Sequence, residues 1–170
     1  FVLYSILGSR GSFVIHSILY PLSQLELSKI HNTYELKEQL PEYLIFGAYP
    51  QVITASTKAE KARILEELVA SYLLKDILEL ERVKGSKVLL DLLRLLAFQV
   101  GSEVSLSELA AQIGIDTKTV GRYLDLFEKS FVLFNLRGFS RNLRKEVTKK
   151  SKYYFCDTGI RNAIISNFND

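Results

Sequence analysis

The sequence predicts a mainly helical α+β fold: a helical body, a winged helix-turn-helix module and short strands. Apolar residues recur at helical spacing between residues 64 and 100. A helix, a glycine-containing turn and a second helix follow one another within residues 105–129. Two short β-rich runs then flank a basic segment near the end of the chain. The 170 residues are 48% hydrophobic and 24% charged, which is typical of a globular protein.

The N-terminal part combines one strand with two helices. The β-rich run 13–19 predicts a strand, and a turn at Pro21 leads into a short helix from about Ser23. The next helix reaches Leu40, and we expect Pro41 to end or restart it, because proline lacks the amide hydrogen that continues a helix.

The helical body is predicted from two apolar stretches. Thr57 and Glu60 have the spacing of a capping box and begin the longest helix, which we expect to reach residue 80. A second helix over residues 88–100 ends at Gly101. This second helix is apolar around much of its circumference, so we expect it to be buried.

The winged helix-turn-helix module starts with another capping box. Ser105 and Glu108 begin one helix, Gly114 supplies a sharp turn, and Asp116 caps the next helix. The inner face of that helix is expected to consist of Val120, Leu124 and Phe127.

The module is predicted to end in a wing and a second strand. The run 131–139 indicates a strand with a turn at Gly138, which would be the tip of the wing. A further strand near residues 152–156 is expected to end in an Asp-Thr-Gly turn formed by residues 157–159.

Catalytic and metal chemistry is sparse in this sequence. No G-x-x-x-x-G-K-[ST] loop for nucleotide phosphates is present. His16, His31 and Cys156 are too few and too scattered for a zinc cluster. Cys156 lies in a β-rich run and is expected to be an inert core thiol. Asp157 is expected to form a turn with Gly159, not to act as a functional acid.

The strongest binding signal is electrostatic. Residues 137–152 carry seven bases and one acid, a net charge of +6 in a chain whose total is +3. The predicted recognition helix runs from Asp116 to Lys129. Its outward face, on which we also place Tyr123, adds short polar donors and cations that suit phosphate contacts. These residues could contact DNA, or they could dock a protein partner or another domain of the same chain. The candidates are Thr117, Lys118, Thr119, Arg122, Arg137, Arg141, Arg144, Lys145, Lys149 and Lys150.

The cellular setting follows from composition. The chain begins at Phe1 and contains no methionine, so we expect it to be a piece of a longer polypeptide. No apolar run approaches the roughly 20 residues that a membrane helix needs. The single cysteine fits a reducing compartment. We therefore expect a cytoplasmic protein that does not contact a membrane.

Five segments in order carry a resemblance to a known family. They are LYPLSQLEL (19–27), YLIFGAYPQVI (43–53), SYLLKDILEL (71–80), the block LSELAAQIGIDTKTVGRYLDLFEKSFVLFNL (106–136) and FSRNLRKEVTKKSKYYFCDTGIRNAI (139–164). This order resembles the C-terminal half of a group of bacterial and archaeal AAA+ ATPases, from about Phe13 to Ile165.

The resemblance implies a division of labour along a longer chain. Walker A and Walker B motifs would lie upstream, and a tail similar to PD-(D/E)XK nucleases would follow. ATP and magnesium would then belong to the parent protein, with no cofactor and no catalysis in this chain. The resemblance implies residues 1–55 as the end of the AAA+ core and a connector, 56–101 as a helical body, 102–140 as a winged-helix-like module, and 141–170 as a basic segment and the start of a C-terminal domain.

Two functions remain open from the sequence. In the first, the winged-helix module relays ATP-driven changes to DNA or to a protein partner. In the second, the chain is a stand-alone winged-helix DNA-binding regulator.

Overall fold

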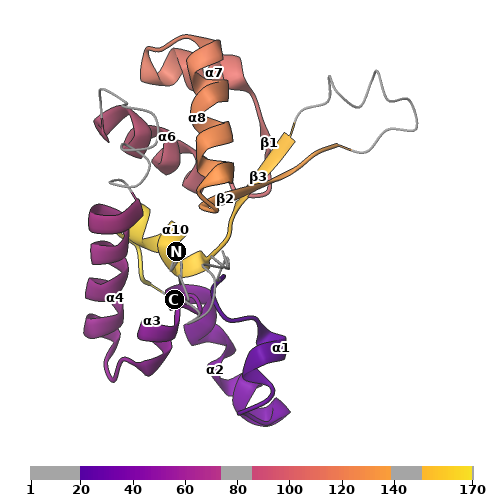
Figure 1. Cartoon of the computed structure of the whole chain (residues 1–170), viewed down its shortest axis with the longest axis vertical. Helices are drawn as coiled ribbons and strands as arrows, with labels where there is room; N and C mark the ends of the chain where they lie inside the picture. The colour runs from indigo at the N-terminus through magenta and orange to yellow at the C-terminus, as the bar shows by residue number, and fades with distance from the viewer. Residues whose placement is uncertain (1–19, 74–85, 139–150, 170) are drawn as a thin grey trace, which may run out of the picture.

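The computed structural model describes residues 20–73, 86–138 and 151–169. In these ranges the chain is mainly helical with one three-stranded antiparallel sheet, which confirms the predicted α+β class. Figure 1 shows helices α1 to α4 in one half of the molecule and α6 to α8 with the sheet in the other. Helix α10, in yellow, lies between the two halves and contacts α2, α4 and α6.

The N-terminal helices begin at side-chain caps. Helix α1 spans Gln24–Leu27, and α2 spans Thr33–Phe46. Ser23 and Asn32 each accept a backbone hydrogen bond three residues ahead, and a glutamate at that position reaches back to the cap. The helix predicted from about Ser23 is confirmed. The predicted strand 13–19 lies outside the described residues.

Helix α2 continues through Pro41, so the prediction of a break there is wrong. Proline removes one intrahelical hydrogen bond and crowds the preceding turn, which costs stability. The turn after Pro41 places Ile45 and Phe46 in the core, where they are 8% and 3% exposed. Burial of these side chains offsets the local cost of the proline.

The body continues with α3 (Pro50–Thr54), α4 (Lys58–Glu67) and the π-helical turn η1 (Leu68–Leu73). The amide of Glu60 donates to the Thr57 hydroxyl at 3.2 Å. The Glu60 carboxylate accepts from the amide of Ser56 at 3.0 Å, one residue before the position that a capping box would use. The predicted course of this helix from residue 74 to residue 80 lies outside the described residues.

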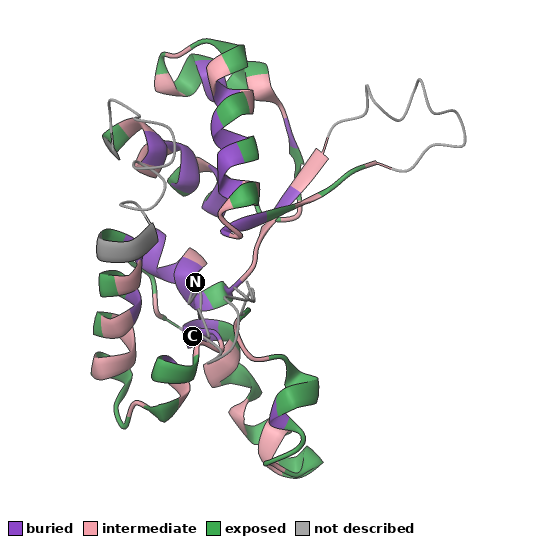
Figure 2. Ribbon diagram, in the orientation of Figure 1, coloured by how far each residue is buried: buried purple, intermediate pink, exposed green. Residues whose placement is uncertain are grey.

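Helix α6 (Ser86–Phe98) supplies the centre of the core, as its apolar sequence predicted. Its fully buried side chains are Leu89, Leu92, Leu93, Leu96 and Ala97. Figure 2 shows buried residues on α6, α8 and α10, and they belong to one hydrophobic cluster that reaches both halves of the molecule.

The winged-helix module consists of β1 (Glu103–Val104), α7 (Leu106–Ile113), α8 (Thr117–Lys129), β2 (Leu133–Leu136) and β3 (Ser151–Phe155). Gly114 ends α7 with a φ of +76°, a left-handed conformation that glycine adopts easily. Asp116 caps α8, as predicted. The predicted inner face is confirmed, because Val120, Leu124 and Phe127 are at most 2% exposed.

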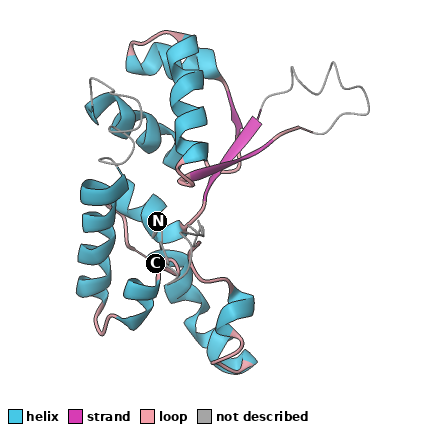
Figure 3. Ribbon diagram, in the orientation of Figure 1, coloured by secondary structure: helices cyan, strands magenta, loops and turns pink. Residues whose placement is uncertain are grey.

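The sheet has the strand order β1-β3-β2, and both pairings are antiparallel. Figure 3 shows the strands as one small sheet beside α8. The predicted turn at Gly138 is wrong, because Leu136 pairs with Lys152 and the connection between the strands therefore spans residues 137–150. A reversal at Gly138 would bring a different residue opposite Leu136.

The predicted Asp-Thr-Gly turn is a helix start. Helix α10 spans Thr158–Ile164, and the Asp157 carboxylate accepts a hydrogen bond from the amide of Ile160 at 3.0 Å. Asp157 thereby caps the N-terminus of α10. Within the residues that the structure describes, no helix has the length and hydrophobicity needed to cross a membrane.

The contact between α10 and α2 predicts different costs for two glycine substitutions. A Cβ at Gly159 would lie 2.1 Å from the carbonyl oxygen of Phe46. A Cβ at Gly114 would meet nothing within 4 Å. An alanine there would therefore lose stability only because it is strained in the left-handed conformation. We expect Gly159→Ala to lower the free energy of unfolding by about 3 kcal/mol or more. Gly114→Ala should cost about 1 to 2 kcal/mol. Urea denaturation of both variants measures the difference, and equal losses would contradict the packing described.

Candidate nucleic-acid interface

The exposed face of α8 carries the first group of predicted binding residues. Thr117, Lys118 and Arg122 are exposed, while the opposite face of the helix is buried against α7 and the sheet. The helix presents this face because its apolar side chains recur at helical spacing on the other side. Two cations and a hydroxyl therefore lie on the exposed side of the first two turns of α8.

Two neighbouring residues are placed differently from the prediction. Tyr123 is 7% exposed and belongs to the core, so its expected position on the outward face is wrong. Its ring packs beneath the Arg122 guanidinium, whose carbon lies 5.5 Å from the ring centre. Thr119 is half-buried, and its hydroxyl donates to the Asp116 carboxylate at 2.5 Å.

The N-terminus of α8 already holds a negative charge. Hydrogen bonds from the side chain and amide of Thr119 lower the pKa of Asp116, so this carboxylate is ionised near neutral pH. It occupies the helix end that would otherwise attract a phosphate. A nucleic-acid backbone would therefore be held by Lys118 and Arg122, farther along the same face.

The second group of predicted residues lies between β2 and β3. Arg137 is exposed directly after β2. The remaining five, Arg141, Arg144, Lys145, Lys149 and Lys150, lie outside the described residues. Pairing of Leu136 with Lys152 fixes both ends of this basic segment at the same end of the sheet. The structure thus attaches the +6 segment to the module that carries Lys118 and Arg122.

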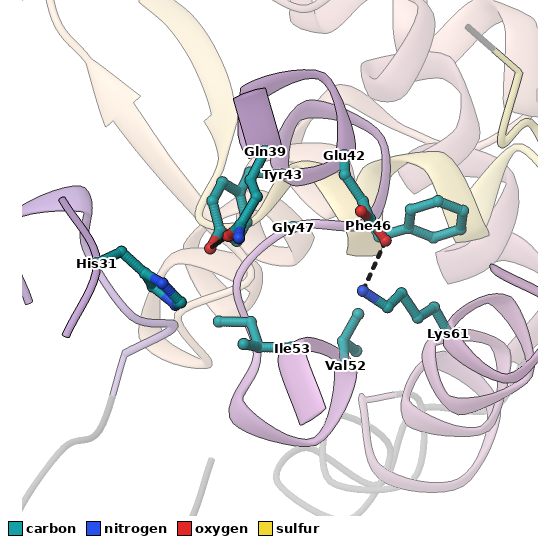
Figure 4. A pocket seen from close by; sticks show the side chains of 9 residues that line it. All are labelled: His31, Gln39, Glu42, Tyr43, Phe46, Gly47, Val52, Ile53 and Lys61. Atoms are coloured by element: carbon teal, nitrogen blue, oxygen red, sulfur yellow. Dashed lines mark hydrogen bonds and ion pairs between the residues drawn. The ribbon is translucent and has the colours of Figure 1, made fainter. Parts of the chain in front are cut away.

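A separate hollow of about 210 Å³ lies among α2, α3 and α4 (Figure 4). The Lys61 ammonium donates to the Glu42 carboxylate at 2.7 Å and ties α4 to α2. The Tyr43 hydroxyl donates to the Gln39 side chain at 2.5 Å. His31, at the other side of the hollow, lies 3.6 Å from Glu35. Only the Lys61–Glu42 pair joins two helices; the other two contacts are local to α2 and the residue before its cap. No nucleophile with an adjacent base is among the three contacts.

Metal and thiol chemistry has little support in the described ranges. No group of three or more His, Cys, Asp or Glu residues there could hold a metal ion. Cys156 lies just after β3 and is only half-buried, not in the core as predicted. Burial and the neighbouring Asp157 raise the pKa of its thiol, which keeps it protonated at neutral pH.

The sequence did not reveal a polar cluster that joins distant helices in the described residues. We name it the α10 cap cluster: Asp157, Thr158, Arg161 and Asn162. Asp157 is 7% exposed, and its carboxylate accepts from the amides of Ala48 at 2.8 Å and Ile160 at 3.0 Å. Burial raises its pKa, although backbone amide donors act in the opposite direction.

The other three members of the α10 cap cluster close the ends of two helices. Thr158 donates to the carbonyl of Tyr43, and Asn162 donates to that of Ile45 at 2.8 Å. Arg161 donates to the carbonyl of Ala97 from Nε at 3.0 Å and Nη2 at 2.9 Å. The last carbonyls of a helix tend to lack partners within the helix. Here α10 supplies donors to those of Ile45 and Ala97, whereas the carbonyl of Tyr43 accepts from the amide of Gly47 as well as from Thr158. Asp157 before an apolar run was the available sequence signal for this helix start.

Comparisons with known proteins place the chain in a family. The family model described as "Domain of unknown function (DUF8612)" matches residues 37–170. The chain therefore belongs to this family. It is 27% identical over 152 residues to an uncharacterized protein of Haemophilus influenzae, with 84% of this chain and 38% of that protein covered. It is 24% identical over 128 residues to an uncharacterized protein of Methanocaldococcus jannaschii, with 72% and 29% covered.

The relatives are much longer than this chain, which spans 38% and 29% of their lengths. No solved structure matches the chain.

The raised pKa of Asp157 predicts an unusual pH dependence. Since its pKa in the folded state lies above the ordinary value of 3.8, the folded protein binds more protons than the unfolded chain between those two values. The contribution of Asp157 to stability therefore falls as the pH rises through this window. Asp157→Asn removes that titration and weakens acceptance from two amides, which should cost about 1 to 3 kcal/mol.

Urea denaturation of wild type and Asp157→Asn at several pH values measures this effect. The stability advantage of the wild type should shrink as the pH rises above about 4. Carboxylates common to both proteins cancel in the difference. If the stability advantage of the wild type grew with pH, the amide hydrogen bonds to Asp157 would outweigh its burial, and the pKa of Asp157 would be lowered instead of raised.

Proposed function

We propose that this member of the DUF8612 family is a non-catalytic part of a longer AAA+ ATPase, whose winged-helix module contacts duplex DNA. The observation that carries the DNA contact is the joint placement of Lys118 and Arg122 with the ends of the basic segment 137–152 on one small module. Several cations on one module neutralise successive phosphates and release counterions. No base-reading pattern is required for this mode of binding.

The connections around α10 support a relay role for this chain. Helix α6 leads into the winged-helix module, and its last turn is capped by Arg161. The strand β3 leads out of the module and is followed by Asp157, which binds the chain after α2. Movement of helices α2 to α4 would thus be passed to the module through hydrogen-bonded helix ends, without flexible linkers in the described residues.

The motor itself is proposed to lie in the rest of the parent protein. The order of segments that resembles AAA+ ATPases supports this, together with the greater length of the two relatives. ATP and magnesium would bind there, and this chain would not turn over nucleotide alone. The single cysteine and the absence of a spanning helix in the described ranges are consistent with the proposed cytoplasmic location.

A salt series tests the DNA contact. We expect the chain to bind a short duplex of arbitrary sequence at low salt, with a linear fall of log K against log salt. The double substitution Lys118→Ala with Arg122→Ala should weaken binding and reduce the slope by about two units, since each lost phosphate contact removes about 0.9. Fluorescence anisotropy with a labelled duplex measures both quantities.

A matched variant controls for net charge. Lys29→Ala with Lys37→Ala removes the same charge from exposed positions in the other half of the molecule. It should leave the slope unchanged. The DNA contact is refuted if the chain fails to bind at low salt, or if the two double variants lose affinity equally.

A further inference from the structure

The three-stranded sheet has a buried face and an open face. Leu133 and Tyr153 lie on the face that packs against α8, where they are 2% and 8% exposed. Side chains alternate between the two faces of a strand, so Phe134 and Leu136 of β2 lie on the other face. There they are 49% and 54% exposed. This open face is separate from the outward face of α8, which lies on the opposite side of the module.

Two aromatic rings form the centre of the open face. Phe134 and Tyr154 lie directly opposite each other in the ladder between β2 and β3. Their rings stack, with centres 5.2 Å apart and planes 14° from parallel. Tyr154 covers one side of the Phe134 ring, and about half of the Phe134 side chain is still exposed. A ring that is stacked on one side and exposed on the other can receive an unpaired nucleobase, which extends the stack.

A hollow of about 320 Å³ adjoins these rings. Tyr154 lines it together with Leu44 of α2 and with Val100, which is 40% exposed. Arg161 also lines the hollow, and its guanidinium is held in place by the carbonyl of Ala97. An apolar lining with one fixed cation suits the flat face of a base and the anionic backbone that carries it.

Charge identifies the occupant as an anion. Lys152 of β3 lies opposite Leu136 and therefore belongs to the open face. Arg137 follows β2 and is exposed. The sequence from 137 to 152 carries seven bases and one acid. Glu103 of β1, opposite Lys152, offsets only one of these charges. Exposed aromatic rings beside concentrated positive charge are the combination that binds single-stranded nucleic acid.

We propose that the open face of the sheet binds single-stranded DNA, with bases stacked on Phe134 and Tyr154 and phosphates neutralised by Lys152 and Arg137. Every base has a flat π surface, so this contact tolerates any sequence. It requires unpaired bases, which a duplex keeps inside its own stack. The choice of DNA rests on the function proposed for α8, and the two surfaces together would hold a duplex next to a single strand.

A tryptophan probe tests the stacking directly. The chain contains no tryptophan, so Phe134→Trp places a single indole in the proposed site. An oligothymidylate of about 12 nucleotides should quench its emission at low salt, because a stacked base quenches indole fluorescence. An abasic oligomer of the same length keeps the phosphates but lacks the bases, and should leave the emission almost unchanged. Tyr34→Trp is the matched control, because Tyr34 is 69% exposed on α2, and its emission should not respond.

Binding of labelled oligothymidylate, measured by fluorescence anisotropy, separates ring stacking from general hydrophobicity. Phe134→Leu keeps an apolar side chain but removes the ring, and should weaken binding roughly tenfold or more. Phe134→Tyr keeps the ring and should bind like the wild type. Lys118→Ala with Arg122→Ala should leave the quenching of Phe134→Trp unchanged, since α8 is not part of this site.

Three results would overturn the proposal: oligothymidylate that leaves the emission of Phe134→Trp unchanged, an abasic oligomer that quenches it equally, or Phe134→Leu that binds like the wild type. Emission that changes with protein concentration alone would show that a second copy covers this face, and would also contradict the proposal. Duplex binding without quenching removes this inference alone, whereas quenching without duplex binding removes only the contact proposed for α8.

Discussion

The structure depends on one buried carboxylate and the helix that it starts. Asp157 binds the amide of Ala48 and that of Ile160, and so fixes the start of α10 against the chain that leaves α2. The two segments approach closely because each contributes a glycine at the contact. A Cβ at Gly47, after α2, would lie 2.1 Å from the Asp157 carboxylate, and a Cβ at Gly159 of α10 would lie 2.1 Å from the carbonyl oxygen of Phe46. Once α10 is placed, Arg161 reaches the last turn of α6. A segment near the end of the sequence therefore holds together helices that begin more than 60 residues earlier.

This arrangement gives the winged-helix module two fixed attachments to the helical body. One is α6, which enters the module, and the other is β3, which leaves it two residues before Asp157. A module attached in this way keeps a defined orientation, which a relay between a motor and DNA would need. Side-chain hydrogen bonds also satisfy backbone groups at the helix ends. Asn162 donates to the Ile45 carbonyl at the end of α2, which contains a proline, and Asp157 accepts from the Ile160 amide at the start of the short helix α10.

Local signals in the sequence predicted much of the fold. The features that sequence analysis missed depend on contacts between residues far apart in the chain. Ser23, Gly114 and Asp116 act on their own neighbours, so the helix ends that they set could be predicted. The course of α2 past Pro41 depends on core burial and on α10, which no local pattern shows. At the candidate site, exposure of Lys118 and Arg122 followed from helical period. Tyr123 was misplaced, although it lies three residues after the buried Val120 and so on the same face.

Native-state hydrogen exchange at the Ala48 amide tests the central role of Asp157 most directly. This amide lies in a loop, and its partner is the Asp157 carboxylate, 109 positions away. If Asp157 joins the two halves, the Ala48 amide should exchange only when the protein unfolds globally, with the same free energy as core amides of α8. Rapid exchange at Ala48 while the Leu124 and Phe127 amides stay protected would show that the halves separate without unfolding, and would contradict the account.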